Sequence, residues 1–482
     1  MHFSIIFRVF GILLTLFSFT LMPPIMVSLF YDDGAVLAFL AAFAITLCTG
    51  TFCWIPVRHM KRELHTRDGF LITALFWFIL SLFGCLPFML AEQLQLSFTD
   101  ALFESISGLT TTGATVITGL DALPKSILYY RQQLQWFGGI GIVVIAVAIL
   151  PMLGIGGMQL YRAETPGPVK DSKLTPRITE TAKALFLIYL GLTAICGFSF
   201  WLAGMDVFDA ICHSFATVAI GGFSTHDASI GHFDSTPIMA VTVFFMILAG
   251  LNFALHFHAW NVKSVKHYFK DPEARFYFTW IVIAAALCSG YLIYSGTYDT
   301  YDSIRHGIFE TVSILTTTGF GTADFTVWPS FLPFFLFYLA FMGGCAGSTG
   351  GGMKVVRVML IMKQGVRELY RLIHPSALFP VKVGNRVVPD KVLEAVWGFF
   401  SVYIVAFALM FLMLLMTGLD FVTAFSAVGA TINNLGPGLG DVAAHYGDIN
   451  DTAKWILCFA MLLGRLEVFT LLVLFTPMFW RS

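Results

Sequence analysis

Thr110-Thr111-Thr112-Gly113-Ala114 is the first of four short segments in which a glycine occurs in the same sequence setting. The other three are Ala219-Ile220-Gly221-Gly222-Phe223, Thr316-Thr317-Thr318-Gly319-Phe320 and Asn433-Asn434-Leu435-Gly436-Pro437. The four glycines are 109, 97 and 117 residues apart, and a small residue stands twelve positions before each of them. One structural unit is therefore repeated four times along the chain.

The composition is that of a membrane protein. Hydrophobic residues make up 57% of the 482 residues and charged residues 12%, whereas soluble domains contain about 25% charged residues. Stretches long and apolar enough to cross a bilayer occur at residues 5–30, 36–57, 69–92, 127–153, 182–204, 236–260, 276–296, 328–362, 392–418 and 452–478. We therefore expect an all-α protein with ten spanning helices. The first stretch lacks the cleavage site of a signal peptide and is expected to be retained.

The basic residues indicate how these helices are oriented. Most of the 28 Lys and Arg residues fall in four loops between alternate spans, at 58–67, 162–183, 263–275 and 363–391. The opposite loops carry mainly aspartate. Because basic loops stay on the cytoplasmic side, both termini are predicted to be cytoplasmic, and all four glycine segments face outward.

A short semi-apolar stretch precedes each glycine segment, at residues 99–110, 207–218, 302–315 and 420–431. These stretches are too short to cross about 30 Å of hydrocarbon, which is typical of re-entrant pore helices. Non-helical backbone at membrane depth is tolerated only where protein buries it or where it lines water. The glycine segments therefore predict an aqueous path, although any one of them alone reads more readily as an ordinary loop.

Glycine suits a filter strand because it accepts positive φ without steric cost. Four such strands can close a ring whose carbonyls replace the water shell of potassium, and the C-terminal ends of the pore helices favour a cation. The hydroxyls of Thr110, Thr111, Thr316 and Thr317 can add oxygen ligands. The predicted ion-binding residues are Thr110, Thr111, Thr112, Gly113, Ala219, Ile220, Gly221, Gly222, Thr316, Thr317, Thr318, Gly319, Asn433, Asn434, Leu435 and Gly436.

The predicted architecture is four pseudo-symmetric helix–pore-loop–helix units around one pore, with two extra N-terminal transmembrane helices. The N-terminal two-helix segment is expected at residues 1–60. The pore units are expected at 61–155, 156–262, 263–388 and 389–482.

The span after the third segment is interrupted by a run rich in glycine, from Gly343 to Gly352. Each glycine costs a helix about 1 kcal/mol relative to alanine. A phosphate-binding loop would need a Lys-Ser/Thr pair directly after its last glycine, and this pair is absent. We expect a flexible gate below the filter rather than simple close packing of helices, formed by Gly343, Gly344, Gly347, Gly350, Gly351 and Gly352.

Arg465 lies near the middle of the last span. A charged residue at this depth usually faces a cavity or a partner. It either repels cations in the pore below the filter, as part of the gate, or forms a buried ion pair with a carboxylate such as Glu104 or Glu310.

These motifs resemble the TrkH/KtrB/HKT superfamily of potassium-translocating subunits, and its TrkH family in particular, over essentially the whole chain. The resemblance implies a pseudo-fourfold pore in one subunit, a homodimer, and a bacterial inner membrane location. It also supports a gating loop and an arginine in the last helix. Serine at the first filter glycine accompanies sodium transport in this superfamily, so Gly113 favours potassium. The fourth segment departs most from the threonine pattern.

Potassium uptake through a channel-like pore is therefore the expected function, and a potassium–proton symporter is the alternative. No catalytic motif, nucleic-acid partner or cofactor is expected, and potassium is the substrate. The resemblance implies a cytosolic nucleotide-binding regulatory subunit of the TrkA type, with the loops 154–183 and 363–391 as candidate contacts. The alternative role of their basic residues is to fix topology alone.

Overall fold

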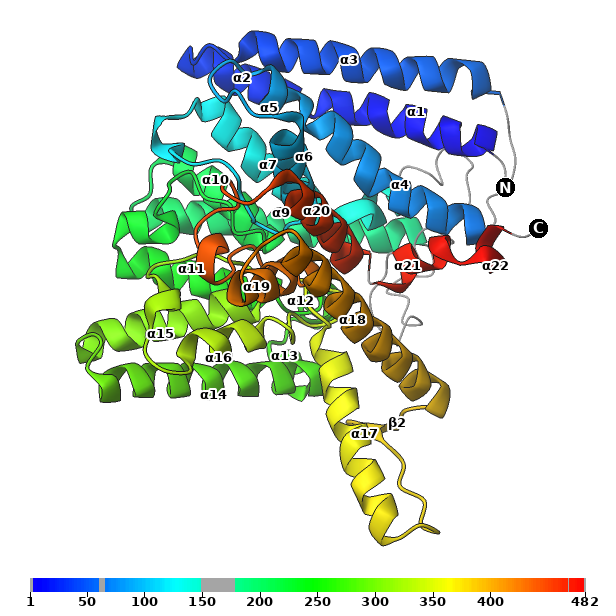
Figure 1. Ribbon diagram of the computed structural model, residues 1–482, viewed down its shortest axis with the longest axis vertical. Helices are drawn as coiled ribbons and strands as arrows, with labels where there is room; N and C mark the ends of the chain where they lie inside the picture. The colour runs from blue at the N-terminus through cyan, green and yellow to red at the C-terminus, as the bar shows by residue number, and fades with distance from the viewer. Residues whose placement is uncertain (1–2, 60–65, 149–177, 467, 481–482) are drawn as a thin grey trace.

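The computed structural model describes residues 3–59, 66–148, 178–466 and 468–480, and its regular structure is almost entirely helical (Figure 1). Among these residues, strands occur only in a small antiparallel hairpin, β1 (Lys382–Val383) and β2 (Arg386–Val387). The all-α fold class is thus confirmed. The predicted unit boundaries at 61 and 155 fall outside the described residues.

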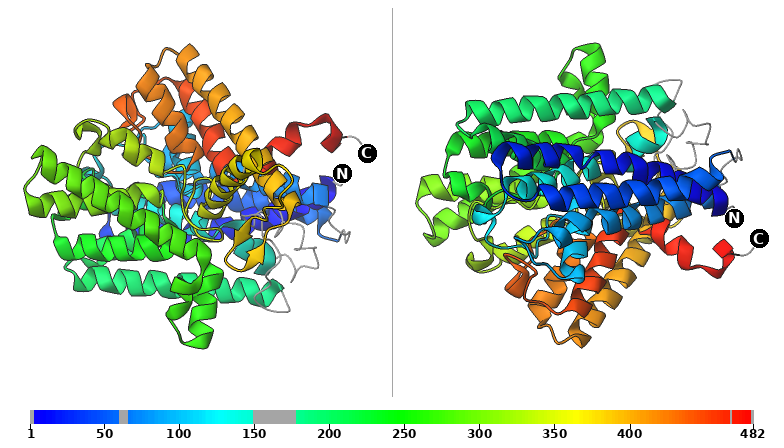
Figure 2. Two further views of the ribbon diagram at one scale, coloured as in Figure 1. Left: turned by 90° about the horizontal axis from the view of Figure 1, so that it is seen from below. Right: turned by 90° about the horizontal axis from the view of Figure 1, so that it is seen from above.

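The N-terminal segment forms the two predicted membrane spans and is built from three helices. They are α1 (Phe3–Phe19), α2 (Met22–Tyr31) and α3 (Val36–Trp54), followed by a 3-10 turn, η1 (Ile55–Val57). Helices α1 and α3 lie side by side across one face of the molecule (Figure 2). The predicted span 5–30 therefore corresponds to α1 and α2 together, which are separated by a turn at Thr20 and Leu21.

Each glycine segment is preceded by a long helix and a short one. The long helices are α4 (Thr66–Gly84, continued by the short α5, Leu86–Leu90), α9 (Ile178–Leu202), α14 (Pro272–Ser295) and α18 (Asp390–Met416). The short helices are α6 (Phe98–Leu109), α10 (Val207–Ala219), α15 (Thr300–Leu315) and α19 (Phe421–Ile432), all within two residues of the predicted stretches.

Side-chain caps fix where the short helices begin. Ser97, Asp206, Asp299 and Asp420 each accept a hydrogen bond from a backbone N–H in the first turn. Ser and Asp are favoured at this position because they satisfy an otherwise unpaired donor. The helices therefore start at these capping residues and end at the glycine segments.

The helix after each glycine segment is interrupted, which the sequence predicted only for the third unit. The interrupted helices are α7 (Lys125–Ala148, non-helical at Gly141), α11 with α12 (Thr236–Ala249, Phe253–Val262), α16 with α17 (Leu332–Leu339, Val355–Ile373) and α20 with α21 (Asp451–Arg465, Phe469–Leu472). The second pair is bent by 95°. The apolar spans predicted at 127–153, 236–260 and 452–478 are therefore interrupted and not continuous helices.

Each interruption contains or adjoins a glycine that stands 28 residues after the filter glycine. These glycines are Gly141, Gly250, Gly347 and Gly464. A Cβ atom on Gly464 would lie 2.1 Å from the carbonyl oxygen of Ile432, at the end of α19. The missing side chain thus lets this helix approach the backbone at the end of the pore helix.

Six described helical spans are long and apolar enough to cross a membrane, or seven if the bent pair α11–α12 is one span. The remaining elements are the short helices α13 (Lys266–Lys270) and α22 (Pro477–Trp480). They also include the 3-10 turns η2 (Leu120–Ala122), η4 (Ser229–Phe233), η5 (Phe325–Val327), η6 (Gly440–Val442) and η7 (Val473–Phe475). Helix α17 and the start of α18 project away from the body, and the start of α1 lies at the same end as α21 and α22 (Figure 1).

Candidate functional site

The four glycine segments begin where the four short helices end, and they are almost completely buried. Thr110, Thr112, Thr316 to Thr318 and Asn433 have no exposed surface, and Leu435 is equally buried. Because each segment follows the C-terminal end of a helix, the partial negative charges of four helices point at the same region.

The four segments share one backbone pattern although their side chains differ. The filter glycine has left-handed φ in every copy: Gly113 81°, Gly222 78°, Gly319 81° and Gly436 99°. The residue two positions earlier is also left-handed: Thr111 54°, Ile220 54°, Thr317 66° and Asn434 52°. Left-handed φ at a β-branched residue such as Ile220 is a genuine outlier. Such strain persists only where the surrounding structure imposes it, and it is concentrated at functional sites.

The segments form a closed ring. A Cβ atom built on each filter glycine would collide with a carbonyl oxygen of the next segment. The pairs are Gly113 with Gly221 (2.2 Å), Gly222 with Thr318 (2.0 Å), Gly319 with Leu435 (2.1 Å) and Gly436 with Thr112 (2.7 Å). In each case the carbonyl belongs to the residue just before the neighbour's own filter glycine. Four segments that are about a hundred residues apart in sequence therefore surround one axis.

A cavity of about 490 Å³ opens on one side of this ring. All four filter glycines line it, together with the residues that follow them. Its wall also includes Asp227, Glu310 and Asp324. The three acidic residues and the four glycines therefore line the same cavity.

A side chain of each short helix holds the chain just after its filter glycine. Glu104 accepts a hydrogen bond from Val116 N–H at 3.0 Å, and Glu310 accepts one from Thr322 N–H at 2.7 Å. In the second unit, His213 Nε2 lies 2.9 Å from the Ser224 hydroxyl. In the fourth unit, the Ser426 hydroxyl accepts a hydrogen bond from Leu439 N–H at 2.8 Å. The exits of all four segments are therefore fixed to their own pore helices.

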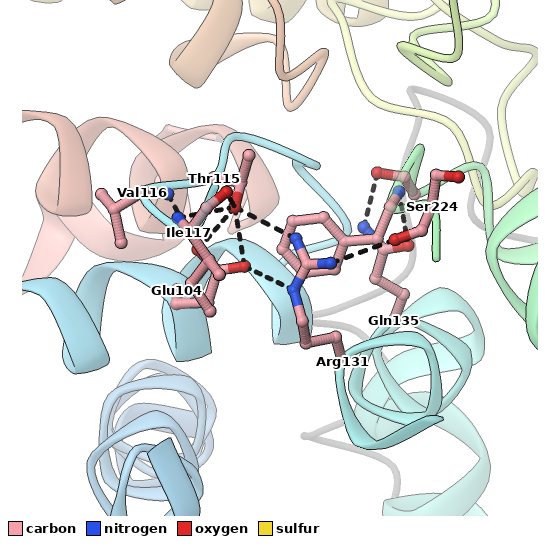
Figure 3. Close-up of polar contacts among 9 residues, drawn as sticks. Glu104, Thr115, Val116, Ile117, Arg131, Gln135 and Ser224 are labelled. Carbon is pink, nitrogen blue, oxygen red and sulfur yellow. Dashed lines mark hydrogen bonds and ion pairs between the residues drawn. The ribbon is translucent and has the colours of Figure 1, made fainter. Parts of the chain in front are cut away.

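An additional ion pair joins the first segment to the second. Arg131 Nε lies 2.8 Å from a Glu104 oxygen, and both side chains are at most 1% exposed. The same guanidinium donates to the Thr115 hydroxyl at 3.0 Å and to the Ser224 carbonyl at 3.1 Å (Figure 3). Gln135 reinforces this link, because its amide nitrogen donates to the Gly221 carbonyl and its oxygen accepts from Phe223 N–H at 3.1 Å.

The threonine and asparagine side chains of the segments bond to protein groups. Thr110 donates to the Ile106 carbonyl at 2.6 Å, and Thr316 makes the equivalent bond to Val312 at 2.7 Å. The fourth segment is held differently, since Asn434 donates to the Thr112 hydroxyl at 3.0 Å. These hydroxyl and amide groups thus help to fix the backbone of the ring.

The glycine-rich run lies against the ring from the side opposite the cavity. Gly351 N–H donates to the Thr317 hydroxyl at 2.7 Å, and Gly352 N–H donates to the Asn433 carbonyl at 3.0 Å. The Thr349 hydroxyl donates to the Val218 carbonyl at 2.9 Å. The run therefore contacts three of the four repeated units. It bonds to the end of the short helix in the second unit and to the glycine segments of the third and fourth units.

Other residues of the run bind its surroundings. Cys345 N–H donates to the Gly250 carbonyl at 2.8 Å, and Phe253 N–H donates to the Gly347 carbonyl at 3.0 Å. Lys354, at the end of the run, donates to the Gly350 carbonyl. The two bonds to Gly250 and Phe253 thus join the interruption between α16 and α17 directly to the one between α11 and α12. Of the remaining predicted gate residues, Gly343 packs against Gly351 and Gly344 against Ser348.

Arg465 connects the glycine-rich run to the first segment. Its guanidinium donates to the Thr349 carbonyl at 3.3 Å, to the Thr111 hydroxyl at 3.4 Å and to the Gly138 carbonyl. The carboxylates suggested as its partners are engaged elsewhere, Glu104 with Arg131 and Glu310 with the chain at Thr322. The structure therefore brings Arg465 and the glycine-rich run together on the side of the ring opposite the cavity.

The geometry above agrees with a known family of membrane proteins. The family model TrkH, described as cation transport protein, matches residues 36–482. This chain belongs to the TrkH family. It is a multi-pass membrane protein, and the TrkH family is a transporter family rather than an enzyme family.

Individual relatives match over the whole length of the chain. The Trk system potassium uptake protein TrkH of Halomonas elongata is 60% identical over 482 residues, covering 100% of both chains. The protein of the same name from Escherichia coli K12 is 55% identical over 486 residues, again with 100% of both chains covered. The crystal structure of the potassium transporter TrkH from Vibrio parahaemolyticus has a TM-score of 0.91 at 55% identity and covers 100% of both chains.

The sequence predictions missed two parts of this TrkH site. The Arg131 network was not predicted, although an arginine and a glutamine four residues apart in an apolar span are a signal of buried function. The helix interruptions in the first, second and fourth units were also missed. The signal for them was the glycine 28 residues after each filter glycine.

Proposed function

We propose that this chain conducts potassium ions through the ring of glycine segments, whose main-chain oxygens replace the ion's water shell. The observation that carries the proposal is the closed ring of glycine-to-carbonyl approaches, from Gly113 around to Thr112. The names of the full-length relatives, potassium uptake proteins, support the choice of ion. Potassium is the substrate, and no cofactor takes part.

Uptake follows from the membrane potential. A potential of 100 mV is worth about 2.3 kcal/mol for each charge that crosses the membrane, so a negative interior draws potassium inward. Flux of potassium, rubidium, sodium and caesium into liposomes containing the purified protein tests the proposal. Potassium and rubidium are expected to permeate best, and equal flux of all four ions would reject a selective ring.

A pore is favoured over a potassium–proton symporter by the orientation of the units. Secondary transporters commonly pair units of inverted topology, whereas here all four short helices end at the same ring. Single-channel recording separates the two mechanisms. Discrete conductance far above transporter turnover supports the pore, and flux strictly coupled to protons supports the symporter.

The glycine-rich run and Arg465 form the gate in this proposal. The run bonds to the inner side of the ring at Thr317 and Asn433. Arg465 adds a positive charge at the same place, next to Thr349 and Thr111. Opening requires both to move away from the axis. The bonds that hold the run are single hydrogen bonds, each worth about 0.5–1.5 kcal/mol, so a modest input of binding energy is enough to move it.

That input is proposed to come from a cytosolic nucleotide-binding subunit of the TrkA type. Helix α17 begins directly after the glycine-rich run, at Val355, and projects from the body toward residues 374–389 (Figure 1). A protein bound to the basic loop 363–391 can therefore pull on the run through one rigid helix. Residues 154–177 of the other candidate loop lie outside the described residues.

Two further proposals concern assembly and location. Helix α17 exposes Leu369 (62%) and Ile373 (68%), and a second copy of the chain is proposed to cover them in a homodimer. Cysteine at position 369 should then form a cross-link between two copies. The protein is proposed to reside in a bacterial inner membrane, surrounded by lipid, with both termini cytoplasmic. The shared position of α1 and α21–α22 at one end supports this topology.

A further inference from the structure

A cluster of one carboxylate and two imidazoles lies at the rim of the cavity beside the ring. Asp121, His226 and His232 each offer a ligand atom, and these atoms all lie within 4.8 Å of one another. His226 is also part of the cavity wall, together with the four filter glycines. None of these three residues takes part in the ring or in the gate.

The three residues come from loops that are fixed to one another. Asp227 accepts hydrogen bonds from Gly119 N–H at 3.1 Å and from Leu120 N–H at 2.9 Å, which holds η2 and Asp121 beside His226. On η4, Gly231 N–H donates to the Gly321 carbonyl at 3.0 Å, which holds His232 beside the third segment. The cluster therefore belongs to the folded pore and not to a loose loop.

His226 is arranged as metal-binding histidines are. Its Nε2 lies 3.1 Å from Asp209 Oδ2, while its Nδ1 faces Asp121. A carboxylate on one ring nitrogen fixes the tautomer and orients the other nitrogen toward a metal. Asp209 is itself held, because the Thr225 hydroxyl donates to its other oxygen at 2.7 Å.

The second imidazole and the carboxylate complete the set. The rings of His226 and His232 stack at 3.5 Å with an interplanar angle of 2°, and Phe233 packs against both. Two imidazoles with one carboxylate are ligands that suit zinc and leave a fourth position open.

We propose that Asp121, His226 and His232 bind a divalent transition metal ion at the outer mouth of the pore, and that the bound ion slows the entry of potassium. Ligand atoms around a tetrahedral zinc ion are about 3.3 Å apart, given zinc–nitrogen distances of about 2.0 Å. The present atoms must therefore move closer. Asp121 and His232 are both exposed, so their side chains can rotate without disturbing the core.

The slowing of flux has an electrostatic cause. A divalent ion at the cavity rim offsets the carboxylates of the wall, Asp227, Glu310 and Asp324, which otherwise raise the local concentration of cations. This part of the inference rests on the proposed conduction, whereas the metal binding does not.

Zinc titration of the full-length protein, purified without a polyhistidine tag, tests the binding by calorimetry. One zinc ion per chain is expected to bind. His232→Ala is expected to abolish this binding, and Asp209→Asn to weaken it by about 10- to 100-fold, as for other residues that orient a metal ligand. His445→Ala is the matched control, because His445 is another partly exposed histidine of the outer loops, near Asp448. Unchanged zinc binding in His232→Ala would overturn the site.

Rubidium flux into liposomes, with and without external zinc, tests the consequence. Each variant is compared with its own zinc-free flux, so that basal differences do not matter. Zinc is expected to reduce the flux of wild type and of His445→Ala, but not of His232→Ala. Zinc that binds without reducing flux would overturn the effect on permeation. Absence of rubidium flux in zinc-free wild type would instead count against the proposed conduction.

Discussion

Alanine at a filter glycine tests the ring, because the four glycines meet their neighbours at different distances. A Cβ atom on Gly222 would lie 2.0 Å from the Thr318 carbonyl oxygen, and one on Gly436 would lie 2.7 Å from that of Thr112. An ordinary contact of this kind begins at 3.4 Å. The two strands must therefore separate much further in Gly222→Ala than in Gly436→Ala.

The energetic cost has two parts. Left-handed φ costs a residue with a side chain about 1–2 kcal/mol, and this cost is similar in both variants. The displacement of the carbonyl differs between them, and distances from ligands to a bound metal ion tolerate only about 0.2 Å. In Gly222→Ala the Thr318 carbonyl is expected to move by more than this. The ion then loses water at this position without gaining an oxygen ligand in its place. We expect the preference for potassium over sodium to fall by about tenfold or more, equivalent to about 1.4 kcal/mol, and by less in Gly436→Ala.

The measurement is the reversal potential with potassium on one side and sodium on the other, together with rubidium uptake into liposomes. Gly290→Ala is the matched control, because Gly290 lies within helix α14 and a Cβ atom there meets nothing within 4 Å. That variant should keep wild-type selectivity. Wild-type selectivity in Gly222→Ala, or a larger loss in Gly436→Ala than in Gly222→Ala, would refute the assignment of the carbonyl ring.

Three further predictions concern the gate and the support of the ring. Arg465→Ala removes the guanidinium that bonds to the glycine-rich run, so potassium flux without a regulatory subunit should rise several-fold, and unaltered conductance would reject its role. Gly351→Ala places a Cβ atom 2.0 Å from the Asn433 carbonyl, which should displace the run and raise resting rubidium flux; lower flux would contradict a gate. Glu104→Gln leaves the buried charge of Arg131 without its partner, which should lower stability by about 3–5 kcal/mol in thermal unfolding. The double variant with Arg131→Met should recover most of this loss, and simple additivity would contradict the pairing.

The bounds of the short helices could be predicted from the sequence. Their limits were predicted to within two residues because the signals are local: Asp206 and Asp420 cap the first turns, and the filter glycines follow the last turns. The helix after the third segment was also predicted to be broken, since the run from Gly343 to Gly352 cannot sustain a helix. At Gly464 a single glycine sits among good helix formers. Such a glycine is compatible with a continuous helix until packing decides otherwise.

The roles of the side chains were harder to predict. That threonine hydroxyls add oxygen ligands stays a prediction, and in the structure Thr110 and Thr316 donate to carbonyls of their own helices. Thr317 accepts a hydrogen bond from Gly351, which is 34 residues away. Whether a hydroxyl is free or engaged depends on groups brought near it by folding, and no local pattern records them.

The sequence alone determined the number of repeats and the position of the glycine in each of them, and it predicted the direction of each unit across the membrane. These features depend on residues that are close together in the chain: apolar length, basic loops and the setting of a glycine. The tertiary structure alone decided which carbonyl each glycine meets, that Arg131 joins the first segment to the second, and that Arg465 contacts the glycine-rich run. Those contacts join residues about a hundred or more positions apart, so only the closing of the ring fixes them.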